Sequence, residues 1–213
     1  MENKLNIYDG EELLGTADVS EDGRWDFKVE DLSVRDYSFR AETFDGKVES
    51  NDWAVTVQQP PLYEDFESGP GGRIGNNTSM GFPTMTVSNN YLGGPPMVIE
   101  VAAYFATPPM ITGRSINIRG TIPNNYVALT LAREARVVKF GIRSDRKVRT
   151  RISYFSASGV LLSDELSPEY GAATAVWVEF SPPSPYEHEL IKRISFSSVG
   201  NQDVSVDNVT MFV

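Results

Sequence analysis

The chain has 213 residues, a formal net charge of −10, 40% hydrophobic residues and no cysteine. This length and hydrophobic content allow one large or two small domains, each with a core of its own. The acidic charge argues against a general binder of the nucleic-acid backbone, because such proteins attract phosphates through a net basic surface. The absence of cysteine excludes disulfides, thiolate zinc sites and a cysteine nucleophile. No apolar run approaches the roughly 18 residues of a membrane span, and the N-terminus lacks the pattern of an export signal.

Charge divides the chain into two predicted modules. Residues 1–58 hold 6 Lys and Arg against 15 Asp and Glu, a net charge of −9, whereas residues 59–213 hold 13 against 14, a net charge of −1. The linker is predicted at 59–61, because Pro60 and Pro61 cannot continue the strand-like run before them. We therefore expect a first domain over 1–58 and a second over 62–213.

The first module is predicted to be all β, as a series of short strands with Asp-Gly turns between them. The expected strands are 5–10, 12–19, 23–29, 37–46 and 48–57. Trp25 and Phe27 alternate with charged residues, which is the pattern of a sandwich with one wet face. The stretches LGTADVSEDGRWDF, YSFRAETFDGKVES and AVTV resemble the later strands of the bacterial Ig-like repeats of surface and adhesion proteins. That resemblance implies a partial Ig-like β-sandwich, since such domains have about seven strands and five are expected here. The sheet edge left open would favour protein contacts through this module.

The second module is also predicted to consist of strands, and their number and spacing favour a jelly-roll sandwich. The expected strands are 85–94, 97–106, 115–122, 137–144, 149–162, 175–182, 190–200 and 204–213. One stretch is ambiguous: residues 128–139, ALTLAREARVVK, suit a short helix and a pair of strands equally well. In a jelly roll the first and last strands commonly lie side by side, so we expect the end of the chain to dock beside the segment from Tyr63 to Glu67.

Four stretches of the second module, DFE, RISYFSASGVLL, IKRISFSS and DNVTM, together resemble the galactose-binding-like β-sandwiches, which include many carbohydrate-binding modules. The resemblance implies a structural calcium ion near the first and last strands. Glu67 and Asp207 match the ligands of that ion, and Asp65 is a third candidate. Calcium prefers six to eight hard oxygen ligands, which carboxylates and carbonyls supply. The alternative is that Asp207-Asn208 forms a local turn or bulge and that Glu67 is only solvated.

The sequence offers no catalytic motif of the nucleophilic type. His188 is the only histidine and lies between two glutamates in PYEHEL, and no G-x-S-x-G motif occurs. A pair of carboxylates could hydrolyse glycosides, and the sequence alone leaves this alternative open. We expect a protein without enzymatic activity.

Aromatic and basic residues of the second module are the candidates for ligand contact. Tyr91, Tyr126 and Tyr170 lie in predicted loops, where their rings could pack on a sugar and face solvent. Residues 133–151 hold eight Lys or Arg against two acids, and Lys139, Arg149 and Arg151 are expected to share one sheet face. The alternatives are that each ring fills the core or rim and that the basic stretch is a solvated surface.

The sequence thus predicts a non-catalytic carbohydrate-binding or adhesion module at the end of a bacterial surface or secreted protein. Its expected partners are a carbohydrate or cell-surface glycan, with calcium as a structural ion and no nucleic acid. The expected location is extracellular or on the cell surface, as part of a longer exported chain. One alternative is a structural stalk or cap that makes protein contacts, and a second is a glycoside-active enzyme.

Overall fold

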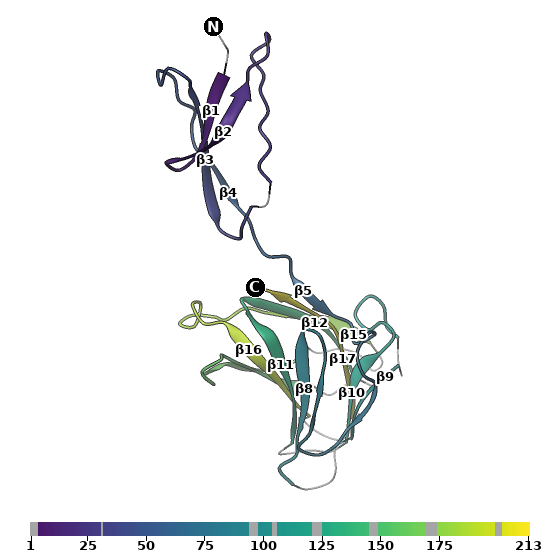
Figure 1. Ribbon diagram of the computed structural model, residues 1–213. Helices are drawn as coiled ribbons and strands as arrows, with labels where there is room; N and C mark the ends of the chain where they lie inside the picture. Colours follow the sequence, from purple (N-terminus) through teal and green to yellow (C-terminus); the bar gives the residue numbers. More distant parts are fainter. Residues whose placement is uncertain are drawn as a thin grey trace. The chain divides into compact units, whose positions relative to one another are not determined.

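The computed structural model describes residues 4–30, 32–93, 98–103, 106–120, 125–144, 149–168, 174–198 and 202–213. Within these ranges every regular element is a β-strand, which confirms the all-β prediction. The described residues include no helix of the length and apolarity that a membrane span requires. The chain divides into two compact units, Met1–Gln59 and Pro60–Val213, shown in Figure 1.

The N-terminal unit contains one antiparallel sheet with the strand order β2, β1, β3, β4. Its strands are β1 (Lys4–Asp9), β2 (Glu12–Asp18), β3 (Asp36–Thr43) and β4 (Trp53–Thr56). Ile7, Ala17 and Ala41 form a small core, and Leu5, Trp25 and Phe27 pack against it. The described residues of this unit contain one four-stranded sheet, whereas an Ig-like domain has two sheets. The resemblance to Ig-like repeats therefore stays a prediction.

The strand predicted over residues 23–29 is wrong, because this segment pairs with no described strand. The alternation behind the prediction is nevertheless present: Trp25 and Phe27 are half-buried, whereas the charged residues between and beside them are exposed. The Phe27 ring covers Gly15 of β2, where an added Cβ would come within 3.0 Å of it. The alternation of side chains therefore predicted correctly which of them are buried, but it did not indicate that the backbone pairs with another strand.

The C-terminal unit is a sandwich of two antiparallel sheets. The seven-stranded sheet has the order β15 (Ala175–Phe180), β12 (Val137–Ser144), β17 (Gln202–Phe212), β10 (Ser115–Gly120), β9 (Val98–Ala102) and β6 (Gly72–Ile74), with β5 (Leu62–Glu64) also paired to β17. The six-stranded sheet has the order β14 (Leu161–Leu166), β13 (Thr150–Phe155), β16 (Ile191–Ser198), β11 (Tyr126–Ala135), β8 (Met85–Asn90) and β7 (Ser79–Gly81). The predicted sandwich is thus confirmed.

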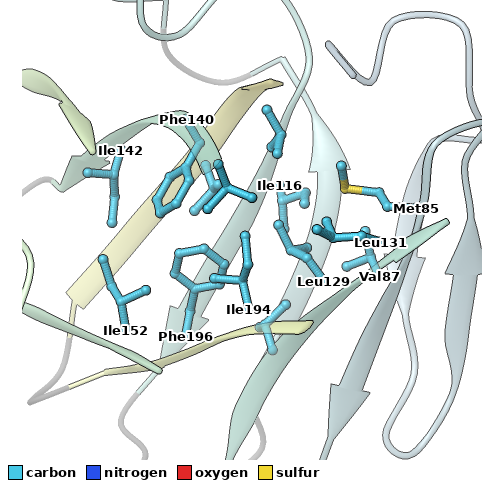
Figure 2. Close-up of a cluster of buried hydrophobic side chains, with 14 of the residues drawn as sticks. Met85, Val87, Ile116, Leu129, Leu131, Phe140, Ile142, Ile152, Ile194 and Phe196 are labelled. Atoms are coloured by element: carbon cyan, nitrogen blue, oxygen red, sulfur yellow. The ribbon is translucent and has the colours of Figure 1, made fainter. Parts of the chain in front are cut away.

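The core of this unit lies between the two sheets, where every second side chain of the inner strands points inward. Figure 2 shows Phe140 and Ile142 of β12 facing Ile152, Ile194 and Phe196 of the six-stranded sheet. The rings of Phe140 and Phe196 meet edge to face, with their centroids 5.4 Å apart. Such contacts add to the burial of large apolar side chains, which is the main stabilising contribution to a sandwich.

The ambiguous stretch 128–139 forms strands, as one of its two interpretations required. It contains the end of β11 and the start of β12, and these strands belong to different sheets. Leu129 and Leu131 are buried while Thr130 between them is half-buried, which is the period of a strand with one face on the core. The expected docking of the chain's end is also confirmed, because Val209 pairs with Glu64 and Met211 with Leu62.

Candidate functional site

Asp207 and Asn208 lie at a break in the last strand. Before them, β17 pairs with β10 from Gln202 to Val206, and after them it pairs with β5 from Val209 to Met211. Its pairing with β12 shifts register at the same place, and Asn208 has a φ of 53°, in the left-handed region that Asn tolerates better than most residues. The dipeptide therefore makes a bulge in β17, which lets this strand pair with β10 before the bulge and with β5 after it.

A loop crosses this bulge on the side of the sheet away from the core, and side chains of the bulge hold it there. The Asn208 Nδ2 atom donates to the carbonyl oxygens of Pro109 and Met110, at 3.0 Å each. The backbone N–H of Thr112 donates to Asp207 Oδ2 at 2.7 Å. Gly141 of β12 makes room for the loop, because an added Cβ would lie 2.0 Å from the Met110 carbonyl oxygen. We call residues 107–113 the strap.

Asp207 is a carboxyl group with no exposed surface. Burial raises its pKa to about 7, although the N–H groups of Thr112 and Asn208 act in the opposite direction. The negative charges of Glu67 and Asp65 raise its pKa further. The three predicted calcium ligands therefore lie close enough for their charges to interact.

The oxygen atoms around these carboxylates do not fit a calcium ion as they stand. The Arg114 guanidinium donates to the carbonyl oxygens of Glu67 and Gly69, both at 2.9 Å, and the Arg114 backbone N–H donates to Glu67 Oε1. The described residues contain no group of three or more His, Asp or Glu side chains placed to hold a metal ion. The Arg114 guanidinium thus occupies the two carbonyl oxygens, and an ion that used them as ligands would have to displace it.

The second candidate site lies on the outer face of the six-stranded sheet, which points away from the core. The strand register aligns a row of small side chains across this face. The row consists of Ser88, Ala128, Ser195 and Ser153. On one side of it, Phe155 and Arg193 are cross-strand partners, and on the other side Tyr126 and Arg151 lie on the flanking strands. Small residues between rows of large ones leave a furrow across the strands.

This furrow is a hollow of about 320 Å³, which we call the outer-face groove. It is lined by Asn125, Tyr126, Ser153, Phe155, Arg193, Ser195 and Ser197. Within the described part of the chain, Asn125 Nδ2, Arg193 Nε and Ser195 Oγ are buried atoms without a hydrogen-bond partner. Each buried polar group without a partner costs about 1–3 kcal/mol, so a ligand that supplies the missing partners would recover that free energy.

The predicted ligand-binding residues fall in different places. Tyr126 lines the groove, and Arg151 lies at its margin, where its guanidinium is 3.2 Å from Asp164 Oδ2. Tyr91 and Arg149 are outside the lining, the first half-buried and the second exposed. Tyr170 lies outside the described residues.

The expectation that Lys139 shares a face with Arg149 and Arg151 is wrong. Lys139 is on β12 of the seven-stranded sheet, 3.6 Å from Glu179, whereas Arg151 is on β13 of the other sheet. The basic stretch thus runs from one sheet to the other and does not form one basic face.

Sequence reasoning missed the residues that make most of the groove. Phe155 and Arg193 were not candidates, and neither were the serines of β13 and β16. A signal was present: RISYFS at 151–156 and RISFSS at 193–198 share a pattern in which polar residues alternate with core residues. Two neighbouring strands with this pattern produce an outer face with small polar side chains in its middle.

Comparisons with known proteins give distant likenesses only. No protein-family model matches the chain, and a search of curated proteins finds no match. A cleaved adhesin domain of Lys-gingipain is 13% identical with a TM-score of 0.44, and the match covers 72% of this chain and 100% of that one. A mutant of the family 29 carbohydrate-binding module CBM29-2, complexed with mannohexaose, is 12% identical with a TM-score of 0.41, over 72% and 92%.

The enzymatically active domain of bacteriophage CBA120 tailspike protein 4 is 13% identical, with a TM-score of 0.39. That match covers 62% of this chain and 20% of the tailspike, so the chain spans about a fifth of its length. At TM-scores below 0.5 these likenesses carry no argument, and the function proposed below rests on the geometry of the outer-face groove.

Proposed function

We propose that the C-terminal unit is a non-catalytic carbohydrate-binding module and that the outer-face groove holds the sugar. The observation that carries the proposal is the combination of aromatic walls with buried polar atoms that lack partners. Phe155 and Tyr126 supply ring surface, on which the C–H groups of a sugar ring can pack. Asn125, Arg193 and Ser195 supply unpaired polar atoms, which sugar hydroxyls can satisfy.

The size of the groove suits a short stretch of oligosaccharide. Its volume of about 320 Å³ falls at the lower end of the range for small-ligand sites, roughly 300–1,000 Å³. Its serine floor is built on paired strands of a sheet, which position side chains more firmly than loops do. The sugar would therefore meet a largely preformed surface.

Binding is favoured over glycoside cleavage by the residues that line the groove. Hydrolysis of a glycoside needs two carboxyl groups on either side of the bond, and none of the described lining residues is an Asp or Glu. The nearby Asp164 accepts from Ser153 Oγ at 2.9 Å and pairs with Arg151. It is thereby committed to contacts at the margin of the groove.

Titration calorimetry of the whole chain against neutral and acidic oligosaccharides tests this proposal. The three tryptophans suit a fluorescence assay poorly, because Trp177 is on the other sheet and the other two are in the N-terminal unit. We expect saturable binding that Phe155→Ala weakens by about tenfold or more, since a stacked ring contributes on the order of 1–2 kcal/mol. The control Phe44→Ala removes an exposed ring of the N-terminal unit and should leave binding unchanged.

Two results would contradict the proposal. One is the absence of saturable binding to any oligosaccharide of the panel. The other is binding that Phe155→Ala and Phe44→Ala affect equally, because the sugar would then lie elsewhere on the molecule.

A second candidate function is adhesion or self-association through the N-terminal unit. Its strands carry large apolar side chains in solvent, including Trp53 and Val55 of β4, which are 45% and 40% exposed. β4 is also an edge of its sheet, and an exposed apolar edge favours pairing with another chain. Sedimentation over a range of concentrations tests this candidate: association that Trp53→Lys abolishes supports it, and a monomer at all concentrations contradicts it.

Calcium as a structural ion at Asp207 remains a separate proposal. The buried carboxyl and its acidic neighbours favour a cation there, whereas the Arg114 guanidinium must leave two carbonyls before the ion can use them. Weak calcium sites are typical of extracellular modules, so the proposal agrees with the expected location outside the cell. Thermal melting with calcium and with chelator tests it: an ion that binds the native state raises the melting temperature, and identical curves exclude the site.

A further inference from the structure

We propose that the sugar bound in the outer-face groove carries a carboxylate, as uronic acids do, and that Arg193 recognises it. This inference rests on the proposed function and adds the chemical class of the ligand.

Arg193 lies in the groove without a counter-charge from any described residue. Its guanidinium carbon is 4.2 Å from the centroid of the Phe155 ring, its Nε atom is buried without a hydrogen-bond partner, and it forms no ion pair with any described residue. Other arginines have such partners: Arg35 is 2.6 Å from Asp9, and Arg151 is 3.2 Å from Asp164. The groove therefore presents a partly desolvated positive charge that no acid in the described part of the chain neutralises.

An anionic ligand compensates that charge better than a neutral one does. A guanidinium offers several N–H donors in one plane, and a carboxylate accepts two of them in parallel. Phe155 packs on the guanidinium and restrains its orientation, so less side-chain freedom is lost when the pair forms. None of the described lining residues is an Asp or Glu that would repel the ligand.

The serines of the groove fit the rest of such a sugar. Ser195 is 7% exposed, and its Oγ has no partner in the described structure. Ser153 on β13 is its cross-strand partner, and Ser197 follows two positions later on β16, so all three lie on the same face of the sheet. Hydroxyl groups donate and accept, so they can pair with sugar hydroxyls whatever their orientation. Arg193 would then give the groove its preference for acidic sugars, while Tyr126 and Phe155 pack against the sugar ring.

The experiment compares matched ligands that differ only in charge. Galacturonate, mannuronate and glucuronate oligomers are titrated into the whole chain, each beside its methyl-esterified form. We expect the acid to bind about tenfold tighter than the ester or more, with an affinity that falls as salt is added. Arg193→Gln should bring the acid down to the affinity of the ester, and Arg193→Lys should restore only part of the difference, because lysine lacks the planar fork.

Arg73→Gln is the control, since it removes one exposed positive charge from β6 of the other sheet. It should leave the preference for the acid unchanged, and melting curves of all variants verify that they fold. Equal binding of acid and ester, binding of neutral sugars only, or a preference that survives Arg193→Gln would each overturn the inference while the proposed function stands. Absence of binding to every neutral and acidic oligomer would instead overturn the proposed function and the inference with it.

Discussion

Substituting Gly141 by Ala tests how the strap is held over the last strand. An added Cβ would lie 2.0 Å from the carbonyl oxygen of Met110 and 2.6 Å from its carbonyl carbon. These are backbone atoms, so no side-chain rotation relieves the overlap. The strap must therefore move away from β12.

The expected loss follows from the contacts that such a movement breaks. Three hydrogen bonds tie the backbone of the strap to the last strand: the Thr112 N–H donates to Asp207, and Asn208 Nδ2 donates to two carbonyl oxygens. At about 1 kcal/mol each, their loss lowers the free energy of unfolding by about 3 kcal/mol. Replacing glycine within a strand is favourable by roughly 0.5–1 kcal/mol, which is smaller, so the net effect is about 2–2.5 kcal/mol of destabilisation.

Urea unfolding followed by circular dichroism measures this difference, with Gly81→Ala as the control. Gly81 lies in β7 with nothing within 4 Å of an added Cβ, so its substitution should leave stability unchanged or raise it slightly. Opposite signs for the two variants are the expected result. Gly141→Ala with a stability equal to that of the wild type would refute the account of the strap.

Three further predictions concern the same unit. Because the pKa of Asp207 is raised from 3.8 to about 7, its contribution to stability is full below about pH 4 and is lost as the pH rises towards 7. The free energy of unfolding should therefore fall by at most about 4 kcal/mol over this range. Unfolding curves at a series of pH values measure this fall, and an equal fall in Asp207→Asn would disprove the prediction. Asn208→Ala should cost about 1–3 kcal/mol by urea unfolding, and Asn208→Gly less, because glycine tolerates the φ of 53°; the reverse order would contradict this reasoning. Phe140→Ala removes a fully buried ring between the sheets and should cost about 3–5 kcal/mol, whereas a loss under about 1 kcal/mol would mean that the core does not depend on it.

Much of the fold could be predicted from local pattern. Alternating burial, as in Leu129 to Leu131, indicates strands, and the turn residues between them indicate that these are short. The docking of the chain's end beside the segment from Tyr63 to Glu67 was expected from jelly-roll topology and is confirmed, with the pairing at Leu62–Glu64. Pattern failed at residues 23–29, because alternation places side chains on two faces whether or not the backbone has a partner.

The candidate site was harder to predict, because it depends on which strands are neighbours. Ser153 and Ser195 are 42 positions apart in sequence and become cross-strand partners only through the pairing of β13 with β16. Serine on a strand carries little information alone. That no described acid pairs with Arg193 is visible only once its surroundings are known. The aromatic residues of the predicted loops attracted attention by their type. The loop prediction is wrong for Tyr126, which begins β11, yet this residue lines the groove.

An NMR titration of the C-terminal unit's amides within the whole chain, with an oligosaccharide that calorimetry shows to bind, tests the central claim most directly. We predict chemical-shift changes confined to the outer-face groove, at Tyr126, Ser153, Phe155, Arg193 and Ser195. Changes confined to the strap and the seven-stranded sheet, with those five amides unmoved, would contradict the account.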